Sequence, residues 1–317
     1  MKKLNFIIKY GLALLLLSFY SCESWLNVTP SDRLSEEMLF NDREGFVKAL
    51  NGVYIELNTN ELYGRNLTAG ALDVMGQYYS VASSSHAFYN YGGLVYTGND
   101  EKALFDNMWQ KCYAVIACCN TIIEKCDENK AGLSPVWRGS IKGEALALRA
   151  MLHFDMLRLF GPLTSELDKE SIPYQTNSDQ TVTPLLSGSE VVGLILDDLK
   201  NAVGLLKDTD PYFVEEEFSD TDLNYRRFRM NYFAAKGLMA RVQLWGGDKE
   251  KAAATAKEVI AEGQAEGAEF FPFVTNSEAT SSNPDRVFYS EVLFGTYHSS
   301  REKLHEDLFA PTLESTS

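Results

Sequence analysis

Glu144 and Arg149 are the charged residues whose setting most invites a chemical interpretation, because they lie five positions apart in a predicted helix. Glycoside hydrolysis needs two carboxyl groups placed across the scissile bond. No motif selects such a pair from the 44 acidic residues of the chain. A buried structural ion pair or a packing role explains Glu144 and Arg149 better than catalysis does. We therefore expect that the protein is not an enzyme.

Other catalytic and metal-binding signatures are missing from the sequence. It contains no GxxxxGK[ST], GxSxG or HExxH motif, and the string nearest to the last, HEDLF at 305–309, lacks the second histidine. The histidines are dispersed, at His86, His153, His298 and His305. The acidic run 215–222 lacks the ligand spacing of a calcium loop, and we expect it to be solvated. No cofactor and no metal are expected.

Four cysteines fall in one stretch that has the pattern of a helix: Cys112, Cys118, Cys119 and Cys126. Three of them, at 112, 119 and 126, are seven residues apart, so they share one helix face at intervals of about 10 Å. Disulfide formation needs Cα atoms within about 7 Å, so these three cannot pair with one another. Zinc-ligand spacing is also missing. We expect the cysteines to be small buried apolar side chains.

The N-terminus has the order of an export signal. Three lysines, Lys2, Lys3 and Lys9, precede a short apolar run from Gly11 to Tyr20, and Cys22 follows. A cysteine in this place predicts a bacterial lipoprotein signal at 1–21, with the lipid attached to Cys22. The alternative is a conventional signal peptide followed by an incidental cysteine. We expect the remaining residues, 22–317, to form one domain.

Composition and charge exclude several classes of protein. With 45% hydrophobic and 23% charged residues, the chain is neither disordered nor a polytopic membrane protein. It has 29 basic and 44 acidic residues, a net charge of −15 that becomes −18 once the three lysines of 1–21 are set aside. So acidic a surface repels phosphate backbones, which argues against a nucleic-acid partner.

Apolar residues at three- and four-residue steps predict a mainly α-helical protein with little strand. Helices are predicted around 46–57, 109–123 and 145–159, around 191–205 with Ser189 as N-cap, and over 232–245 and 249–262. Asn41 or Asp42 is the expected N-cap of the first, and Gly161-Pro162 ends the third. The best strand candidate is Val287 to Phe294.

Two pairs of helices are expected to form hairpins. Small apolar residues of 232–245 would meet those of 249–262 across the turn GGDK, with Ala252, Ala253, Ala256, Val259 and Ile260 on the second helix. This resembles a tetratricopeptide repeat. Segments 137–160 and 189–206 could form a second pair. The helical pattern is broken at 58–100, 163–188 and 207–229, and long irregular insertions of this kind are usually functional or disordered.

Several motifs in this order resemble the SusD/RagB family of nutrient-binding outer-membrane lipoproteins. They are WLNVTPSD after Cys22, LFNDREGFVKALNGVY, Trp109-x3-Tyr113-x2-Ile116-x3-Asn120, KGEALALRAMLHFDMLRLFGP at 142–162, NYFAAKGLMARVQL, and EVLF at 291–294. The resemblance implies tetratricopeptide-like hairpins with long binding loops. Family members usually continue well beyond the EVLF segment, so the domain is expected to be incomplete at its C-terminus.

The resemblance also implies a function: surface capture of glycan and its delivery to a SusC-like TonB-dependent transporter in the outer membrane. Sugar faces suit aromatic platforms with a few polar groups at their edges. The aromatic loop before the Trp109 helix offers both, and our candidate ligand-binding residues are Tyr78, Tyr79, His86, Phe88, Tyr89, Tyr91, Tyr96 and Asn99. About half of these rings are expected to pack internally.

Three other functions stay open at this point. Some members of the family serve peptide uptake, which would need fewer exposed rings and more hydrogen-bonding groups. A lipid-anchored helical-repeat scaffold would bind a protein through its concave face. A surface glycoside hydrolase would release reducing ends. We rank glycan capture above all three.

Overall fold

The computed structural model describes residues 36–179, 181–214, 217–265 and 268–309. The structure is mainly α-helical with little strand, as the periodicity predicted. Six long helices form its body: α4 (Arg43–Leu57), α7 (Asn99–Glu128), α8 (Pro135–Phe160), α9 (Gly188–Thr209), α11 (Tyr232–Trp245) and α12 (Lys249–Gly263).

Short elements occupy the connections. They are the helices α3 (Glu36–Leu39), α5 (Ala71–Met75), α6 (Tyr89–Gly92), α10 (Asp220–Asn224), α13 (Asn276–Ala279) and α14 (Arg301–Leu308), and the 3-10 turns η2 (Thr164–Glu166), η4 (Arg226–Phe228) and η5 (Tyr289–Glu291). Two antiparallel ribbons complete the described residues. One pairs β1 (Glu170–Pro173) with β2 (Leu185–Ser187), and the other pairs β3 (Gln264–Ala265) with β4 (Ala268–Glu269).

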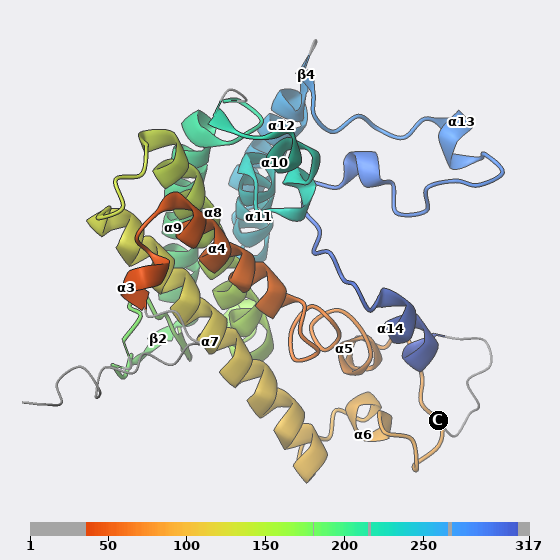
Figure 1. Ribbon diagram of the computed structural model, residues 1–317. Helices are drawn as coiled ribbons and strands as arrows, with labels where there is room; N and C mark the ends of the chain where they lie inside the picture. Colours follow the sequence, from red (N-terminus) through yellow and green to blue (C-terminus); the bar gives the residue numbers. More distant parts are fainter. Residues whose placement is uncertain (1–35, 180, 215–216, 266–267, 310–317) are drawn as a thin grey trace, which may run out of the picture.

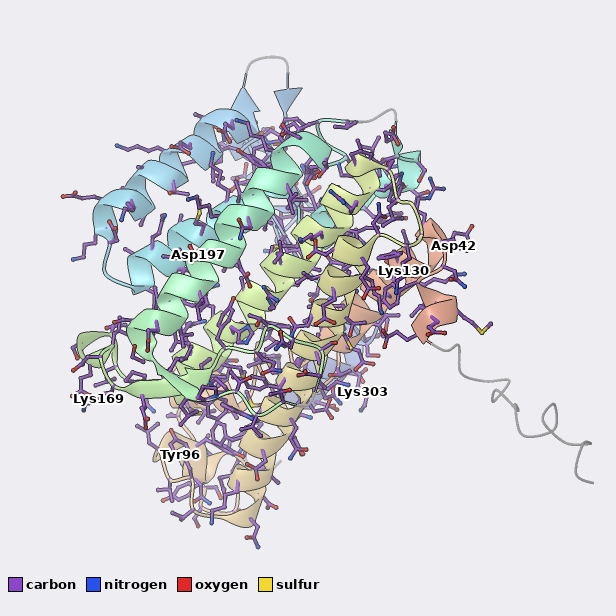
Figure 2. All side chains as sticks on the ribbon, turned by 90° about the vertical axis from the view of Figure 1, so that its left-hand side faces the viewer. Asp42, Tyr96, Lys130, Lys169, Asp197 and Lys303 are labelled. Carbon is purple, nitrogen blue, oxygen red and sulfur yellow. The ribbon has the colours of Figure 1, made fainter. Side chains whose placement is uncertain are left out.

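The long helices are stacked side by side, each packing on its neighbours. The order of contact is α4, α7, α8, α9, α11 and α12 (Figures 1 and 2). Both predicted hairpins are confirmed: α8 packs along α9, and α11 packs along α12. The turn between α11 and α12 passes through Gly247, whose φ of 93° favours glycine.

Side-chain caps set where the helices begin. Asp42 accepts a hydrogen bond from the Gly45 amide at 2.8 Å, which confirms it as the N-cap of α4. The predicted cap Ser189 is wrong, because α9 begins two residues earlier. Ser187 caps it and forms a reciprocal capping box with Glu190. The glutamate at the third helical position makes this arrangement the more favourable of the two.

One apolar core runs through the stack and contains three of the four cysteines. Cys112, Cys119 and Cys126 are buried on one face of α7, as expected, and all four described thiols are free. Cys118 corrects the prediction, because it is exposed. Its position next to Cys119 turns it about 100° away from the buried face.

Buried ion pairs join the helices. Arg149 on α8 pairs with Asp198 on α9, and Glu144 pairs with Arg226 and Arg229. Arg226 also pairs with Asp210, which is itself fully buried. Glu144 and Arg149 are therefore structural, as expected, although each pairs with residues from other segments.

The electrostatics of Glu144 follow from these pairs. Burial alone would raise the pKa of its carboxyl group, but the Arg229 and Arg226 guanidinium groups outweigh burial, and the pKa lies below its usual value. The Tyr54 hydroxyl also donates to Glu144 at 2.7 Å. Glu144 therefore stays ionised and ties α4, α8 and η4 together.

The predicted strand Val287–Phe294 is wrong. This segment forms the turn η5 and extended backbone without a ladder. The Asp285 side chain accepts from the amides of Val287 at 3.0 Å and Tyr289 at 2.7 Å, and Phe288 has a left-handed φ of 51°. Local side-chain hydrogen bonds thus take amides that a strand would need.

The face that α12 turns toward α11 also differs from the prediction. Ala252 and Val259 are buried and Ala256 is half-buried, whereas Ala253 and Ile260 are exposed. Thr255, between Ala252 and Val259, is also buried, and its hydroxyl donates to the Gln243 side chain at 2.9 Å. A polar residue takes the place because it has a partner on the facing helix.

The predicted signal at 1–21 and the lipid site Cys22 lie outside the described residues. Within the described part, none of the helices combines the length and the apolar character that crossing a membrane requires.

Candidate functional site

The loop between α4 and α7 has a small core of its own. Ala71 and Val74 of α5 pack with Tyr91 of α6, and partly buried rings and apolar side chains surround them. Phe105, on the first turns of α7, contacts Tyr91 and also Phe160 at the end of α8. Because α7 is 30 residues long, its N-terminal part extends beyond the main stack and carries this loop (Figure 1).

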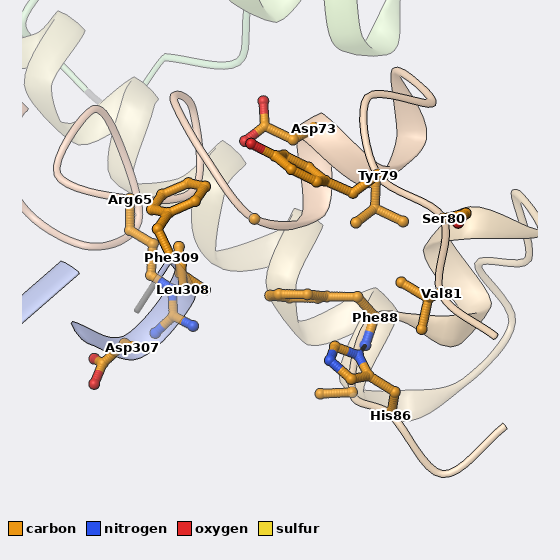
Figure 3. A pocket seen from close by; sticks show the side chains of 13 residues that line it. Arg65, Asp73, Tyr79, Ser80, Val81, His86, Phe88, Asp307, Leu308 and Phe309 are labelled. Carbon is orange, nitrogen blue, oxygen red and sulfur yellow. Dashed lines mark hydrogen bonds between the residues drawn. The ribbon is translucent and has the colours of Figure 1, made fainter. Parts of the chain in front are cut away.

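A pocket of about 300 Å³ lies between this loop and α14. We call it the aromatic pocket. It is lined by Arg65, Gly70, Asp73, Val74, Tyr79, Ser80, Val81, His86, Ala87, Phe88, Asp307, Leu308 and Phe309. Figure 3 shows the rings of Tyr79, Phe88 and Phe309 around one hollow, with Arg65 and Asp307 at its margin.

The rings of the aromatic pocket are held by contacts with their neighbours. Tyr79 and Phe309 have ring centroids 6.1 Å apart, and the His86 and Phe88 rings are 5.7 Å apart. The Phe88 amide donates to His86 Nδ1 at 3.1 Å. The backbone also comes close at Gly70, where a Cβ would lie 3.1 Å from the Phe88 ring. Gly70 has a φ of 74°, so glycine suits this position on both grounds.

The structure brings three of the eight predicted ligand-binding residues into the aromatic pocket: Tyr79, His86 and Phe88. Tyr78 and Tyr89 are exposed outside it, with Tyr78 81% exposed, and Asn99 is exposed at the start of α7. The remaining two rings pack internally. Tyr91 is 3% exposed, and Tyr96 meets Phe105 edge-on at 5.3 Å.

Tyr91 and Tyr96 have the properties of packing residues. Burial raises the pKa of both phenols, and for Tyr91 the Glu101 and Asp100 carboxylates add to that effect. Both side chains therefore stay neutral at physiological pH. Their rings connect the loop to the helical stack through Phe105.

Several pocket residues were missed by sequence reasoning: Arg65, Asp73, Asp307, Leu308 and Phe309. The last three come from the end of the described chain, which α14 brings against α5 (Figure 1). No local pattern indicates this approach. The only local signal is the aromatic residue at 309, at the end of the string HEDLF.

The aromatic pocket has groups that suit the binding of a small molecule. Rings offer apolar faces, and Arg65, Asp73 and His86 offer hydrogen-bonding groups at the edges. Among the described residues, no group of three or more histidine, cysteine or acidic side chains is arranged to hold a metal ion.

Comparison with known proteins gives a consistent assignment. Residues 24–244 match a SusD-like family model described as "Starch-binding associating with outer membrane". SusD-like protein P2 of Formosa agariphila is 25% identical over 265 residues, which cover 81% of this chain and 46% of that protein. A SusD-like protein of Bacteroides ovatus is 30% identical over 146 residues, which cover 45% of this chain and 23% of that protein.

Solved structures share the fold. A SusD superfamily protein from Bacteroides thetaiotaomicron aligns with a TM-score of 0.57 at 21% identity, over 75% of this chain and 49% of that one. A SusD-like carbohydrate binding protein from Bacteroides vulgatus aligns with a TM-score of 0.58 at 23% identity, over 75% and 47%. The chain thus spans less than half the length of these relatives. Because the family model covers more than half of its residues, the chain belongs to the SusD-like family.

Proposed function

We propose that this protein captures oligosaccharide or polysaccharide in the aromatic pocket, as a binding protein without a covalent step. The observation that carries the proposal is the grouping of Tyr79, Phe88 and Phe309 around one hollow of about 300 Å³. This volume is at the lower end of the range for small-molecule sites, about 300–1,000 Å³. The family description, which names starch binding, supports it.

The physical basis is the two-sided character of a sugar ring. A pyranose presents apolar C–H faces, which an aromatic ring can cover, and polar hydroxyls at its edge. Arg65, Asp73 and His86 stand at the margin of the aromatic pocket, where they can exchange hydrogen bonds with those hydroxyls. Tyr78 and Tyr89, exposed on the same loop, are proposed to extend the surface toward a longer chain.

The same proposal covers location and partner. Lipidation of Cys22 would hold the protein on the outer membrane, exposed at the cell surface, and a SusC-like TonB-dependent transporter would receive the captured sugar. The words "associating with outer membrane" in the family description support the location. A lipid anchor suits a chain that binds at a surface and hands its ligand to a neighbour in the same membrane.

We further propose that the site does not hydrolyse its ligand. A hydrolase needs one carboxyl group that remains protonated beside the leaving oxygen. Asp73 and Asp307 both line the aromatic pocket, but Asp307 forms an ion pair with Lys303 at 3.2 Å. Asp307 is therefore already engaged by a lysine of its own helix, and no sequence motif pairs it with Asp73 as two catalytic carboxyl groups.

The test is native affinity electrophoresis of the full chain in a non-ionic detergent, against gels containing different polysaccharides. We expect at least one polysaccharide to retard the protein and Tyr79→Ala to reduce that retardation strongly. Tyr225→Ala is the matched control, because Tyr225 is exposed but lies outside the aromatic pocket. Retardation by none of the polysaccharides, together with binding of a peptide mixture, would replace glycan capture with peptide uptake. Release of reducing ends would indicate a hydrolase.

A further inference from the structure

A second cavity adjoins the aromatic pocket and has a different character. We call it the polar pocket. It measures about 320 Å³ and lies between the segment after α4 and the start of α14. Its lining includes Asn58, Asn60, Arg65, His298 and Lys303. Arg65 and Asp307 line both cavities, so a ligand lying in one can reach into the other.

The polar pocket has a local excess of positive charge. The acidic residue of the lining is Asp307, and its charge is balanced by Lys303, with which it pairs at 3.2 Å. Within the described ranges, the Arg65 guanidinium forms no ion pair and no side-chain hydrogen bond. Arg65 is half-buried and has no carboxylate partner among the described residues, although the chain has a net charge of −15. Arginine binds carboxylate and sulfate-like groups through its planar donor fork.

The wall of the polar pocket also has unused hydrogen-bonding capacity. Asn58 Oδ1 and His298 Nδ1 are covered from solvent and have no hydrogen-bond partner among the described residues. Asn58 is already held through its amide nitrogen, which donates to the Tyr54 carbonyl at 2.8 Å. An unpaired buried polar atom is costly, so a ligand hydroxyl that reached either group would relieve that cost.

We propose that the ligand is an acidic glycan, with a sugar ring in the aromatic pocket and a carboxylate or sulfate group bound by Arg65 and Lys303 in the polar pocket. This inference rests on the proposed glycan function and specifies its ligand class. The two adjoining pockets supply the three kinds of group that such a ligand needs. They are aromatic rings for the sugar face, a cation for the acidic group, and amide or imidazole groups for the hydroxyls. A neutral glycan would leave the Arg65 charge without a counter-charge.

The experiment compares acidic polysaccharides with their neutralised forms. The acidic polymers are polygalacturonate, alginate and chondroitin sulfate. Each is compared with a neutral form of the same polymer, made by reducing its carboxyl groups and, for chondroitin sulfate, by also removing its sulfate groups. Binding is measured by affinity electrophoresis of the full chain in detergent. We expect at least one acidic polymer to bind at least about tenfold more tightly than its neutralised form. Its affinity should fall as salt is raised, because salt screens exposed charges.

Substitutions at two positions, Arg65 and Lys303, assign the effect to the polar pocket. Arg65→Gln should weaken binding of the acidic polymer by about tenfold or more, and Arg65→Lys should restore part of the loss. Lys303→Gln should weaken it too, and this change leaves the fold intact because the Lys303 side chain is 73% exposed. Lys130→Gln, which removes the same charge beyond the C-terminal end of α7, should have no effect.

The outcomes separate the ligand class from the function. Equal or tighter binding of the neutralised polymer, or equal effects of Arg65→Gln and Lys130→Gln, would refute the acidic ligand and leave glycan capture standing. Failure of every polymer, acidic or neutral, would refute glycan capture, and the acidic ligand with it. Binding of poly-glutamate in place of the polysaccharides would reassign the polar pocket to an acidic peptide.

Discussion

Arg149 and Asp198 form a buried two-point ion pair that joins α8 to α9. Arg149 Nε donates to Asp198 Oδ2 and Nη2 donates to Oδ1, each at 2.7 Å. The Tyr174 hydroxyl also donates to Asp198 Oδ2 at 2.6 Å, and Asn120 on α7 accepts from Arg149 Nη1 at 2.8 Å. Three helices and the segment after β1 therefore meet at one guanidinium group.

Removing one member of this pair should destabilise the fold strongly. Arg149→Leu leaves the Asp198 carboxylate buried without its counter-charge, and breaking a buried pair in this way costs about 3–5 kcal/mol. Urea unfolding followed by circular dichroism measures the loss. The double change Arg149→Met with Asp198→Leu should be less destabilising than Arg149→Leu alone, since it removes both charges. A loss below about 1 kcal/mol for Arg149→Leu would contradict the structural role.

The stability of the protein should depend on pH through His153. Burial, the largest effect, and the nearby Arg149 charge lower its pKa from 6.5 to about 3. The ring lies 2.9 Å from the Arg149 carbonyl through Nδ1, and Nε2 accepts from the Gln175 amide at 3.0 Å. The neutral ring therefore satisfies both contacts, whereas a proton on Nε2 would oppose the Gln175 amide.

The sign of this effect follows from linkage. The unfolded chain binds a proton at His153 below about pH 6.5, and the folded chain does not until about pH 3. This contribution to stability is complete above pH 6.5 and is lost as the pH falls toward 3, by about 1.4 kcal/mol per unit. His153→Gln should show a shallower decline in unfolding free energy between pH 6 and 4. Parallel curves for the two proteins would refute the assignment.

The cysteines of α7 should differ in reactivity. Burial raises the pKa of Cys126 to about 12 and also raises the pKa of Cys118, so the thiols differ in access: Cys118 is exposed, whereas Cys112, Cys119 and Cys126 are buried. In native protein with Cys22 replaced by alanine, a thiol reagent such as DTNB should therefore modify one cysteine rapidly. Cys118→Ser should abolish the rapid phase. In denaturant, all four thiols of the protein that retains Cys118 should react. Rapid reaction of the native Cys118→Ser variant would contradict the burial of Cys112, Cys119 and Cys126.

Tyr79 should contribute measurably to glycan affinity. Its ring forms one wall of the aromatic pocket, and losing an aromatic contact of this kind costs about 0.5–1.5 kcal/mol beyond the buried area. Tyr79→Ala should therefore raise the Kd of the retarding glycan by about tenfold, while Tyr79→Phe should retain most of the affinity. Isothermal titration measures both. An equal loss in Tyr79→Phe would assign the effect to the hydroxyl group in place of the ring.

Cys22 should determine membrane attachment. We expect the protein to sediment with bacterial outer membranes and to incorporate labelled palmitate. Replacing Cys22 by alanine removes the thiol that would carry the lipid, so this variant should lose the label and become soluble. Continued incorporation of palmitate by Cys22→Ala would place the anchor elsewhere.

The sequence by itself determined the long helical elements and the two pairs of them that form hairpins. Helix formation depends on neighbours three and four residues apart, so periodicity located α11 at Tyr232–Trp245, and Asp42 and Gly161 marked the ends of α4 and α8. The same geometry placed Cys112, Cys119 and Cys126 on one buried face. Where local hydrogen bonds competed with the pattern, as in Val287–Phe294, the prediction failed.

Only the tertiary structure decided which distant side chains meet. Glu144 was noted in the sequence, but its partner Arg226 lies 82 positions away and Arg149's partner Asp198 lies 49 away. Tyr79 was predicted as a binding residue, but its ring neighbour Phe309 belongs to a distant segment of the chain. Tyr91, predicted with it, is buried. Contacts between distant segments depend on how whole helices pack, and no local pattern of residue types encodes that packing.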